Sequence, residues 1–238
     1  MNFFLRIRRL SVYLYLQNGI EFDAPHLDFN HCYYQDITTA LEHIMENTSI
    51  KYYDTVANSY FLSTVHANLT ESWNLFFQNL PTRNPSILDA GCGSGRDTVE
   101  FISRGALVDA FDGSKKMAEK ASEYTNIDVQ HCLFTNFQSD KQYDGIWASA
   151  SLLHVLEDDL PATIAHLKQF LKPDGTMYAS FKSEKDASQH ELRHFTNLNL
   201  DEAKQLFESL GFTSVSAQTM IESREEVGKI NWTVVIAK

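Results

Sequence analysis

The chain is poor in cysteine, and its three cysteines lie far apart. Cys32, Cys92 and Cys132 are odd in number among 238 residues and share no short spacing. Disulfide-rich domains and cysteine-based zinc sites use closely spaced, paired cysteines. The sequence therefore argues against both, suggests no metal site, and fits a protein of the reducing cytoplasm.

Basic residues are scarce relative to acidic ones. The chain has 20 Lys and Arg against 31 Asp and Glu, which gives a formal net charge of −11. Nucleic-acid binding depends on neutralising phosphates with clustered Lys and Arg. The only tight basic cluster is Arg6, Arg8 and Arg9, so we do not expect DNA or RNA as a partner.

Long apolar runs are absent as well. No run approaches the ~18 residues that a membrane-spanning helix needs. The apolar stretch at 10–16 follows the basic cluster as in a signal peptide, but Gln17 and Asn18 interrupt it and no small-residue cleavage site follows. We therefore expect a cytoplasmic protein with no membrane partner, either a monomer or a homodimer.

Two regions differ in pattern. Residues 1–48 show no sustained helical or strand periodicity before about 37–45. We therefore predict that residues 1–48 are an N-terminal extension and that residues 49–238 form one domain. Met45 directly precedes this domain, and we hypothesise that it is the natural start. Residues 51–80 carry apolar side chains at helical spacing. We expect strands at 87–89, 106–112, 128–132, 144–149, 176–181 and 232–237. We expect one helix after the first strand, ending at about 104, and further helices at 115–124, 160–171 and 201–210. A turn is expected at 173–175.

Strands that alternate with helices of about ten residues indicate βαβ units and parallel pairing. The predicted fold class is α/β, a doubly wound, mostly parallel, seven-stranded Rossmann-like sheet with an antiparallel edge strand. The N-terminal extension would be helical or irregular.

A glycine-rich turn follows the first expected strand, with Gly91, Gly93 and Gly95 directly before Arg96. Ligands bind at such carboxyl ends in open α/β sheets. A dinucleotide fingerprint needs G-x-G-x-x-G, and its third glycine would stand where this chain has Arg96. The phosphate-binding G-x-x-x-x-G-K-[ST] loop is also missing. The spacing therefore speaks against a nicotinamide oxidoreductase and a P-loop enzyme.

Asp112 ends the second expected strand. An ionised carboxylate there can accept hydrogen bonds from both hydroxyls of a ribose. The alternative is that Asp112, or Ser114 beside it, only caps the next helix. We favour the ribose role, because the position of Asp112 and the glycine turn support each other.

These motifs together resemble the class I S-adenosylmethionine-dependent methyltransferases, over roughly residues 50–238. The turn reads D-x-G-x-G-x-G from Asp89, as in the first motif of that family. The resemblance is nearest to a bacterial small-molecule-type subgroup beside the tellurite-resistance methyltransferases. The stretches that carry it are 52–60, 88–98, 110–117, 143–155, 171–175 and 194–196.

The resemblance implies S-adenosylmethionine as cofactor and S-adenosylhomocysteine as product. It implies that helices within 49–80 form a lid, in which Tyr53 and Tyr60 face the cofactor and substrate; the alternative is a core helix whose tyrosines simply pack. The adenine contacts are less defined, because Thr135 and Asn136 stand where many relatives have an acidic residue. The implied cofactor-binding residues are Tyr60, Asp89, Gly91, Gly93, Gly95, Asp97, Asp112, Gly113, Met117, Leu133, Phe134, Ala148 and Ser149.

Methyl transfer from a sulfonium mostly requires in-line positioning and exclusion of water. A base is needed only if the acceptor loses a proton during attack. His154, just after the fourth expected strand, is the candidate catalytic base, with a packed residue as the alternative. Tyr60, Arg193, His194 and Arg224 could bind the acceptor; for each of them the alternative is a surface or structural role.

We therefore expect a methyltransferase that acts on a small molecule by positioning. The alternatives are a protein methyltransferase and a non-catalytic S-adenosylmethionine-binding module. The sequence does not identify the acceptor atom.

Overall fold

The computed structural model describes residues 31–184, 193–224 and 228–238. The chain divides into two compact units, 1–41 and 42–238. The described residues of the first unit, 31–41, form the first part of helix α2 (His31–Thr64). The basic cluster and the apolar stretch at 10–16 lie outside the described residues. Helix α2 is continuous through residue 48, and the predicted domain boundary there stays a prediction.

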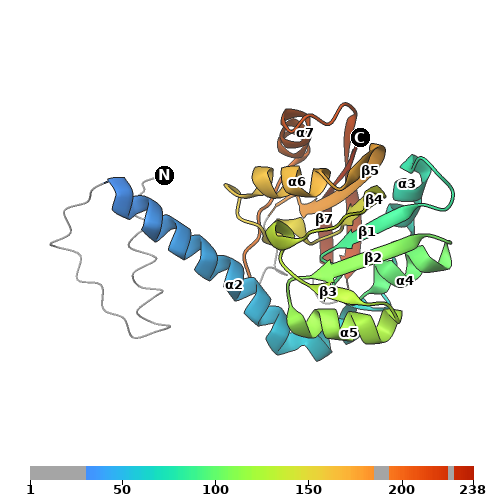
Figure 1. Ribbon diagram of the computed structural model, residues 1–238, viewed down its shortest axis with the longest axis horizontal. Helices are drawn as coiled ribbons and strands as arrows, with labels where there is room; N and C mark the ends of the chain where they lie inside the picture. The colour runs from blue at the N-terminus through green and yellow to red at the C-terminus, as the bar shows by residue number, and fades with distance from the viewer. Residues whose placement is uncertain (1–30, 185–192, 225–227) are drawn as a thin grey trace. The chain divides into compact units, whose positions relative to one another are not determined.

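The second unit is built on one seven-stranded sheet in the order β3-β2-β1-β4-β5-β7-β6 (Figure 1). Five strands pair in parallel, so their carboxyl ends lie at the same edge of the sheet. They are β1 (Ser86–Ala90), β2 (Leu107–Asp112), β3 (Val129–His131), β4 (Tyr143–Ala148) and β5 (Leu171–Lys182).

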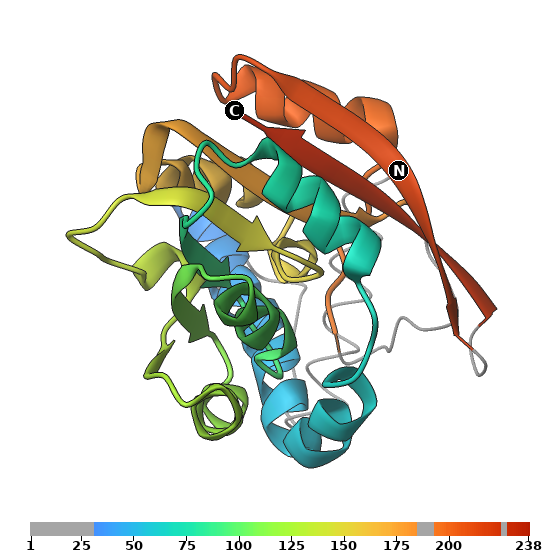
Figure 2. The ribbon, with the colours of Figure 1, turned by 90° about the vertical axis from the view of Figure 1, so that its right-hand side faces the viewer.

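The other two strands form the far edge. Strand β7 (Gly228–Ala237) runs antiparallel to β5, and β6 (Val215–Arg224) pairs antiparallel with β7. Figure 2 shows this pair as a long two-stranded ribbon at one side of the sheet. The predicted fold class is confirmed, and the reversed strand is β7, the second from the edge.

Alternating side chains along the strands build a core on each face of the sheet. On one face Leu88, Ile146 and Met177 pack with α6 (Leu160–Lys168) and α7 (Leu200–Ser209). On the other face Ile87 and Trp147 pack with α3 (Thr70–Asn79) and α4 (Arg96–Ser103), while α5 (Lys115–Thr125) covers β2 and β3.

Two local predictions change. The helical region expected at 51–80 is two helices, α2 and α3, and Asn68 accepts a hydrogen bond from Thr70 N at 2.8 Å where the second helix begins. The turn expected at 173–175 lies inside β5, which pairs with β4 at Leu171 (with Tyr143) and again from Thr176 (with Gly145), so that residues 172–175 form an irregular stretch not paired with β4. A register shift between Tyr143 and Gly145 takes up the extra residues.

In the part of the chain that the structure describes, no helix is long and apolar enough to cross a bilayer.

Candidate cofactor and acceptor site

A cavity opens at the carboxyl ends of β1 to β4. The strand order reverses between β1 and β4, and such switch points are where open α/β sheets bind ligands. The cavity is lined by helix α2 and the loops after these strands. Its lining residues are Ser49, Ile50, Tyr53, Tyr60, Gly91, Gly93, Phe111, Asp112, Gly113, Ser114, Met117, Leu133, Phe134, Ala150, Ser151, His154 and Val155.

The glycine turn forms one wall of the cavity. Gly91 has φ +78°, and a Cβ on it would lie 2.6 Å from the Cβ of Ser151. Its N–H and that of Cys92 donate to the carbonyl oxygen of Phe111 at 2.9 and 3.0 Å. Position 91 therefore requires glycine for two reasons: its backbone is left-handed, and the loop after β4 approaches it closely.

Asp112 faces this cavity from the end of β2. Its two carboxylate oxygens accept the N–H groups of Gly93 at 2.9 Å and Ser114 at 2.8 Å. Burial raises the pKa of Asp112, while these two N–H donors oppose the shift. The helix cap is Ser114, whose Oγ accepts the N–H of Met117 at 3.2 Å. Each Asp112 oxygen keeps a lone pair for a ligand hydroxyl.

Helix α2 lies across the cavity. Asp54 Oδ1 anchors it by accepting the hydroxyl of Ser114 at 2.6 Å and the N–H of Lys116 at 3.1 Å. Tyr53 and Tyr60 both line the cavity, and their rings meet edge to face at 4.9 Å. The two residues are seven apart, so they share one face of the helix.

His154 is held at both ring nitrogens. Nδ1 lies 2.7 Å from the carbonyl oxygen of His194, and Nε2 lies 2.8 Å from the hydroxyl of Tyr53. Burial lowers the pKa of His154 to about 3, so the imidazole is neutral. The carbonyl can only accept, so Nδ1 carries the proton and Nε2 accepts from Tyr53. The lone pair that a base would use is therefore already engaged.

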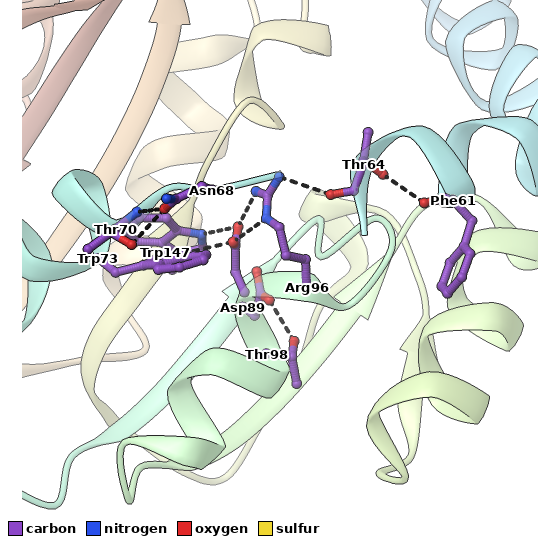
Figure 3. Close-up of polar contacts among 10 residues, drawn as sticks. Phe61, Thr64, Asn68, Thr70, Trp73, Asp89, Arg96, Thr98 and Trp147 are labelled. Atoms are coloured by element: carbon purple, nitrogen blue, oxygen red, sulfur yellow. Dashed lines mark hydrogen bonds and ion pairs between the residues drawn. The ribbon is translucent and has the colours of Figure 1, made fainter. Parts of the chain in front are cut away.

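Asp97 lies in a separate buried cluster. Its carboxylate accepts the indole N–H groups of Trp73 and Trp147, each at 2.9 Å. Arg96 donates to both oxygens, at 2.7 and 2.9 Å, and reaches the carbonyl oxygen of Thr64 at 3.5 Å. Figure 3 shows the side chains of Trp73, Trp147 and Arg96 close together, with dashed lines that mark these contacts. We call Asp97, Arg96, Trp73 and Trp147 the Asp97 cluster.

Asp89 is buried near this cluster and accepts the hydroxyl of Thr98 at 2.6 Å (Figure 3). Burial, and then the charge of Asp97, raises the pKa of Asp89 to about 8. Its carboxyl group is therefore mostly protonated at neutral pH.

The cavity brings together most of the residues expected from the sequence. Those that line it are Tyr60, Gly91, Gly93, Asp112, Gly113, Met117, Leu133, Phe134 and His154. Asp89, Gly95, Asp97, Ala148 and Ser149 are not among the lining residues.

The loop after β4 explains part of this difference. Ala148 ends the strand, and Ala150 and Ser151 form the cavity wall in its place. Ala150 adopts φ +50°, and Ser151 Oγ donates to the carbonyl oxygen of Ala90 at 2.7 Å. Tyr53 and Tyr60, the two tyrosines expected in the lid, both line the cavity. Sequence reasoning missed Ile50 as a lining residue, although its helical spacing to Tyr53 was a usable signal.

Known proteins share this architecture. A chain titled "DhpI-SAH complex structure" superposes with a TM-score of 0.63 at 19% identity, over 82% of this chain and 97% of that one. The Burkholderia thailandensis 1,6-didemethyltoxoflavin-N1-methyltransferase, with bound 1,6-didemethyltoxoflavin and S-adenosylhomocysteine, gives 0.61 at 23% identity, over 91% and 93%. The fold is that of the class I methyltransferases. These identities support the fold alone.

Sequence similarity agrees over a shorter span. Residues 87–175, from β1 into β5, match a family described as "Methyltransferase domain". An uncharacterized methyltransferase from Staphylococcus carnosus (strain TM300) is 30% identical over 127 residues, or 50% of this chain. The match covers 61% of the length of that relative. The resemblance seen in the sequence is confirmed at the level of the methyltransferase fold.

Proposed function

We propose that the protein transfers a methyl group from S-adenosylmethionine to a small-molecule acceptor. The observation that carries this proposal is the cavity at the switch point, where the glycine turn and Asp112 stand together. That the protein belongs to a subgroup beside the tellurite-resistance methyltransferases remains a prediction.

The residues present fit the cofactor. Asp112 has acceptor capacity left for ribose hydroxyls, and Met117, Leu133 and Phe134 offer an apolar surface for adenine. The glycine turn leaves backbone exposed for the methionine part. When bound, the cofactor supplies an electrophilic methyl group on a positively charged sulfur.

The chain's own contribution is placement and exclusion of water. Tyr53 and Tyr60 of helix α2 line the cavity, which supports a lid within 49–80 as part of this proposal. Ala150, Ser151 and His154 close the side that follows β4. We propose that the acceptor binds between these two walls, and that His154 positions Tyr53 through their hydrogen bond.

The first test is calorimetric titration with S-adenosylmethionine, S-adenosylhomocysteine and NAD. We expect micromolar binding of the first two and none of NAD. Asp112→Ala should weaken binding by about tenfold or more, because it removes a charge-assisted hydrogen-bond acceptor. Asp140→Ala, which removes an exposed charge on the loop before β4, is the matched control. Unchanged affinity in Asp112→Ala would remove the ribose assignment.

A folded sample that binds neither S-adenosyl compound would refute the proposed function. Binding without methyl transfer to any small molecule or protein tested would indicate the non-catalytic module.

A further inference from the structure

A short segment before α7, residues 193–196, joins the two walls of the cavity, and we call it the strap. The N–H of His194 donates to Ser49 Oγ on α2 at 3.0 Å. The carbonyl oxygen of the same residue accepts from His154 Nδ1, in the loop after β4, at 2.7 Å. One residue of the strap therefore uses both of its backbone polar groups, one on each wall of the cavity.

The strap is itself fixed to the loop after β4 by Thr196, which is 5% exposed. The Thr196 N–H donates to the carbonyl oxygen of Leu153, and its hydroxyl donates to that of Val155, each at 2.7 Å. Because this hydroxyl hydrogen is used, the Thr196 oxygen accepts from His194 Nε2, at 2.9 Å. The strap is therefore seated on the wall that follows β4 and reaches across to α2 at Ser49.

Helix α2 meets the strap and the loop after β4 at two points one helical turn apart. Ser49 accepts from the strap, and Tyr53 donates its hydroxyl to His154 Nε2 at 2.8 Å. Arg193 of the strap donates to the same Tyr53 hydroxyl at 3.2 Å. Residues 49 and 53 share one face of the helix, and both line the cavity. These hydrogen bonds fasten α2 at the acceptor end of the cavity, and none of them involves the glycine turn or Asp112.

The same helix also lies over the end of the cavity that we assign to the cofactor. A Cβ on Gly113 would lie 3.7 Å from Ile50 Cγ1. A Cβ on Gly93 would lie 3.9 Å from Tyr60 Cε1. Gly113 follows Asp112, and Gly93 belongs to the glycine turn, so side chains of α2 rest on both loops. We therefore expect α2 to move when the cofactor enters or leaves, and its contacts at the acceptor end to break as it does so.

We propose that the strap is a latch for α2, and that it must release before S-adenosylmethionine or S-adenosylhomocysteine can exchange. The identity of these ligands rests on the proposed function. A latched cover excludes water during methyl transfer. A gate of this kind lowers the rate of entry in proportion to the fraction of molecules that are open. Loosening the latch should therefore speed both association and dissociation, whereas loss of a ligand contact speeds dissociation alone.

Two substitutions loosen the latch from opposite sides. Ser49→Ala removes the acceptor of the His194 N–H, and Thr196→Val removes the hydroxyl that seats the strap on Val155. Surface plasmon resonance on the immobilised full chain measures the association and dissociation rates of S-adenosylhomocysteine. We expect both rates to rise about fivefold or more, because losing a buried hydrogen bond shifts the opening equilibrium by at least that factor. The dissociation constant should change less than either rate.

Each substitution has a matched control. Thr176→Val corresponds to Thr196→Val, because the Thr176 hydroxyl is also buried and donates to a carbonyl oxygen, that of Asn79, at 2.7 Å. Thr176 does not line the cavity. Ser59→Ala corresponds to Ser49→Ala, since the Ser59 hydroxyl donates within α2. Both controls should leave the two rates unchanged, as should Thr196→Ser, which keeps the hydroxyl. Thermal unfolding checks that each variant is folded.

Hydrogen exchange tests the latch without any ligand. In Ser49→Ala and in Thr196→Val, exchange should rise together over residues 49–56 and 193–198. A rise confined to one of these segments would overturn the inference, as would unchanged or slower association of S-adenosylhomocysteine with either folded variant. Failure of S-adenosylhomocysteine to bind the unaltered chain would instead refute the proposed function. The exchange measurement would still decide whether the strap and α2 open together, so the two failures are distinguishable.

Discussion

At the scale of single residues, a glycine can be required for its backbone conformation, for the lack of space for a side chain, or for both. Gly91 and Gly105 both have positive φ, +78° and +89°. A Cβ at Gly91 would overlap Ser151 at 2.6 Å, whereas a Cβ at Gly105 would meet only Asn84 Oδ1 at 3.9 Å. Comparing the two positions therefore separates backbone strain from steric overlap.

Gly91→Ala should destabilise the protein more than Gly105→Ala. Both substitutions cost roughly 1 kcal/mol for the left-handed backbone, and Gly91→Ala adds an overpacking cost of about 1–3 kcal/mol. Chemical denaturation of the two variants measures the difference. Equal losses of stability would mean that the loop after β4 moves aside without cost.

Asp89 should make stability fall as pH rises. Its carboxyl ionises near pH 3.8 in ordinary surroundings and near about 8 in the fold. Between these values the folded protein binds the proton and the unfolded chain does not, so raising the pH favours unfolding. The slope for one such proton approaches about 1.4 kcal/mol per pH unit.

Asp89→Asn, which keeps an oxygen to accept from Thr98, should flatten this slope. Denaturation between about pH 5 and 8 measures the slope. Asp140→Asn changes an exposed charge and should keep it. A slope that is the same in Asp89→Asn and the unaltered chain would show that Asp89 ionises normally.

At the scale of helices and strands, several polar contacts hold residues 49–64 of α2 to the sheet, among them Tyr53 with His154 and Ser49 with the N–H of His194. Asp54 joins it to the start of α5 through Ser114 and Lys116, and Arg96 reaches its last turn at Thr64. Since α2 supplies Tyr53 and Tyr60 to the cavity, these contacts connect the cover of the site to the glycine turn and the Asp112 loop.

Asp54→Ala should loosen α2 and weaken S-adenosylhomocysteine binding. The loss leaves the Ser114 hydroxyl and the Lys116 N–H without their acceptor, at a cost of about 1–3 kcal/mol. Hydrogen exchange over residues 49–64 should rise. Thr55→Ala alters an exposed neighbour that bonds only within the helix and should leave exchange unchanged. Unaltered exchange in Asp54→Ala would show that the other contacts of α2, such as the Tyr53–His154 hydrogen bond, hold it without Asp54.

At the scale of the whole molecule, residues 42–238 form one compact unit that contains every residue of the cavity. A chain shortened to begin at Met45 should therefore keep its melting temperature and its affinity for S-adenosylhomocysteine. Thermal unfolding and calorimetry on both lengths provide the measurement. Loss of folding in the shortened chain would show that the preceding residues are needed.

The sequence predicted the parallel strands and the glycine turn because their signals are local. Glycine spacing, apolar runs and the position of Asp112 all lie within short stretches. The partners of His154 could not be predicted this way, because Tyr53 and His194 come from distant parts of the chain. The turn expected at 173–175 is an irregular stretch inside β5, because pairing with β4 on both sides of it, at Leu171 and at Thr176, continues the strand.

The Asp97 cluster gives the protein an intrinsic fluorescence signal from two buried tryptophans. The chain has three tryptophans, and two of them, Trp73 and Trp147, donate their indole N–H to one carboxylate. Indole emission shifts to longer wavelengths when water replaces a dry environment. The ultraviolet fluorescence of the unlabelled protein should therefore report when α3 separates from the sheet, and a stopped-flow instrument could follow that event without any attached dye.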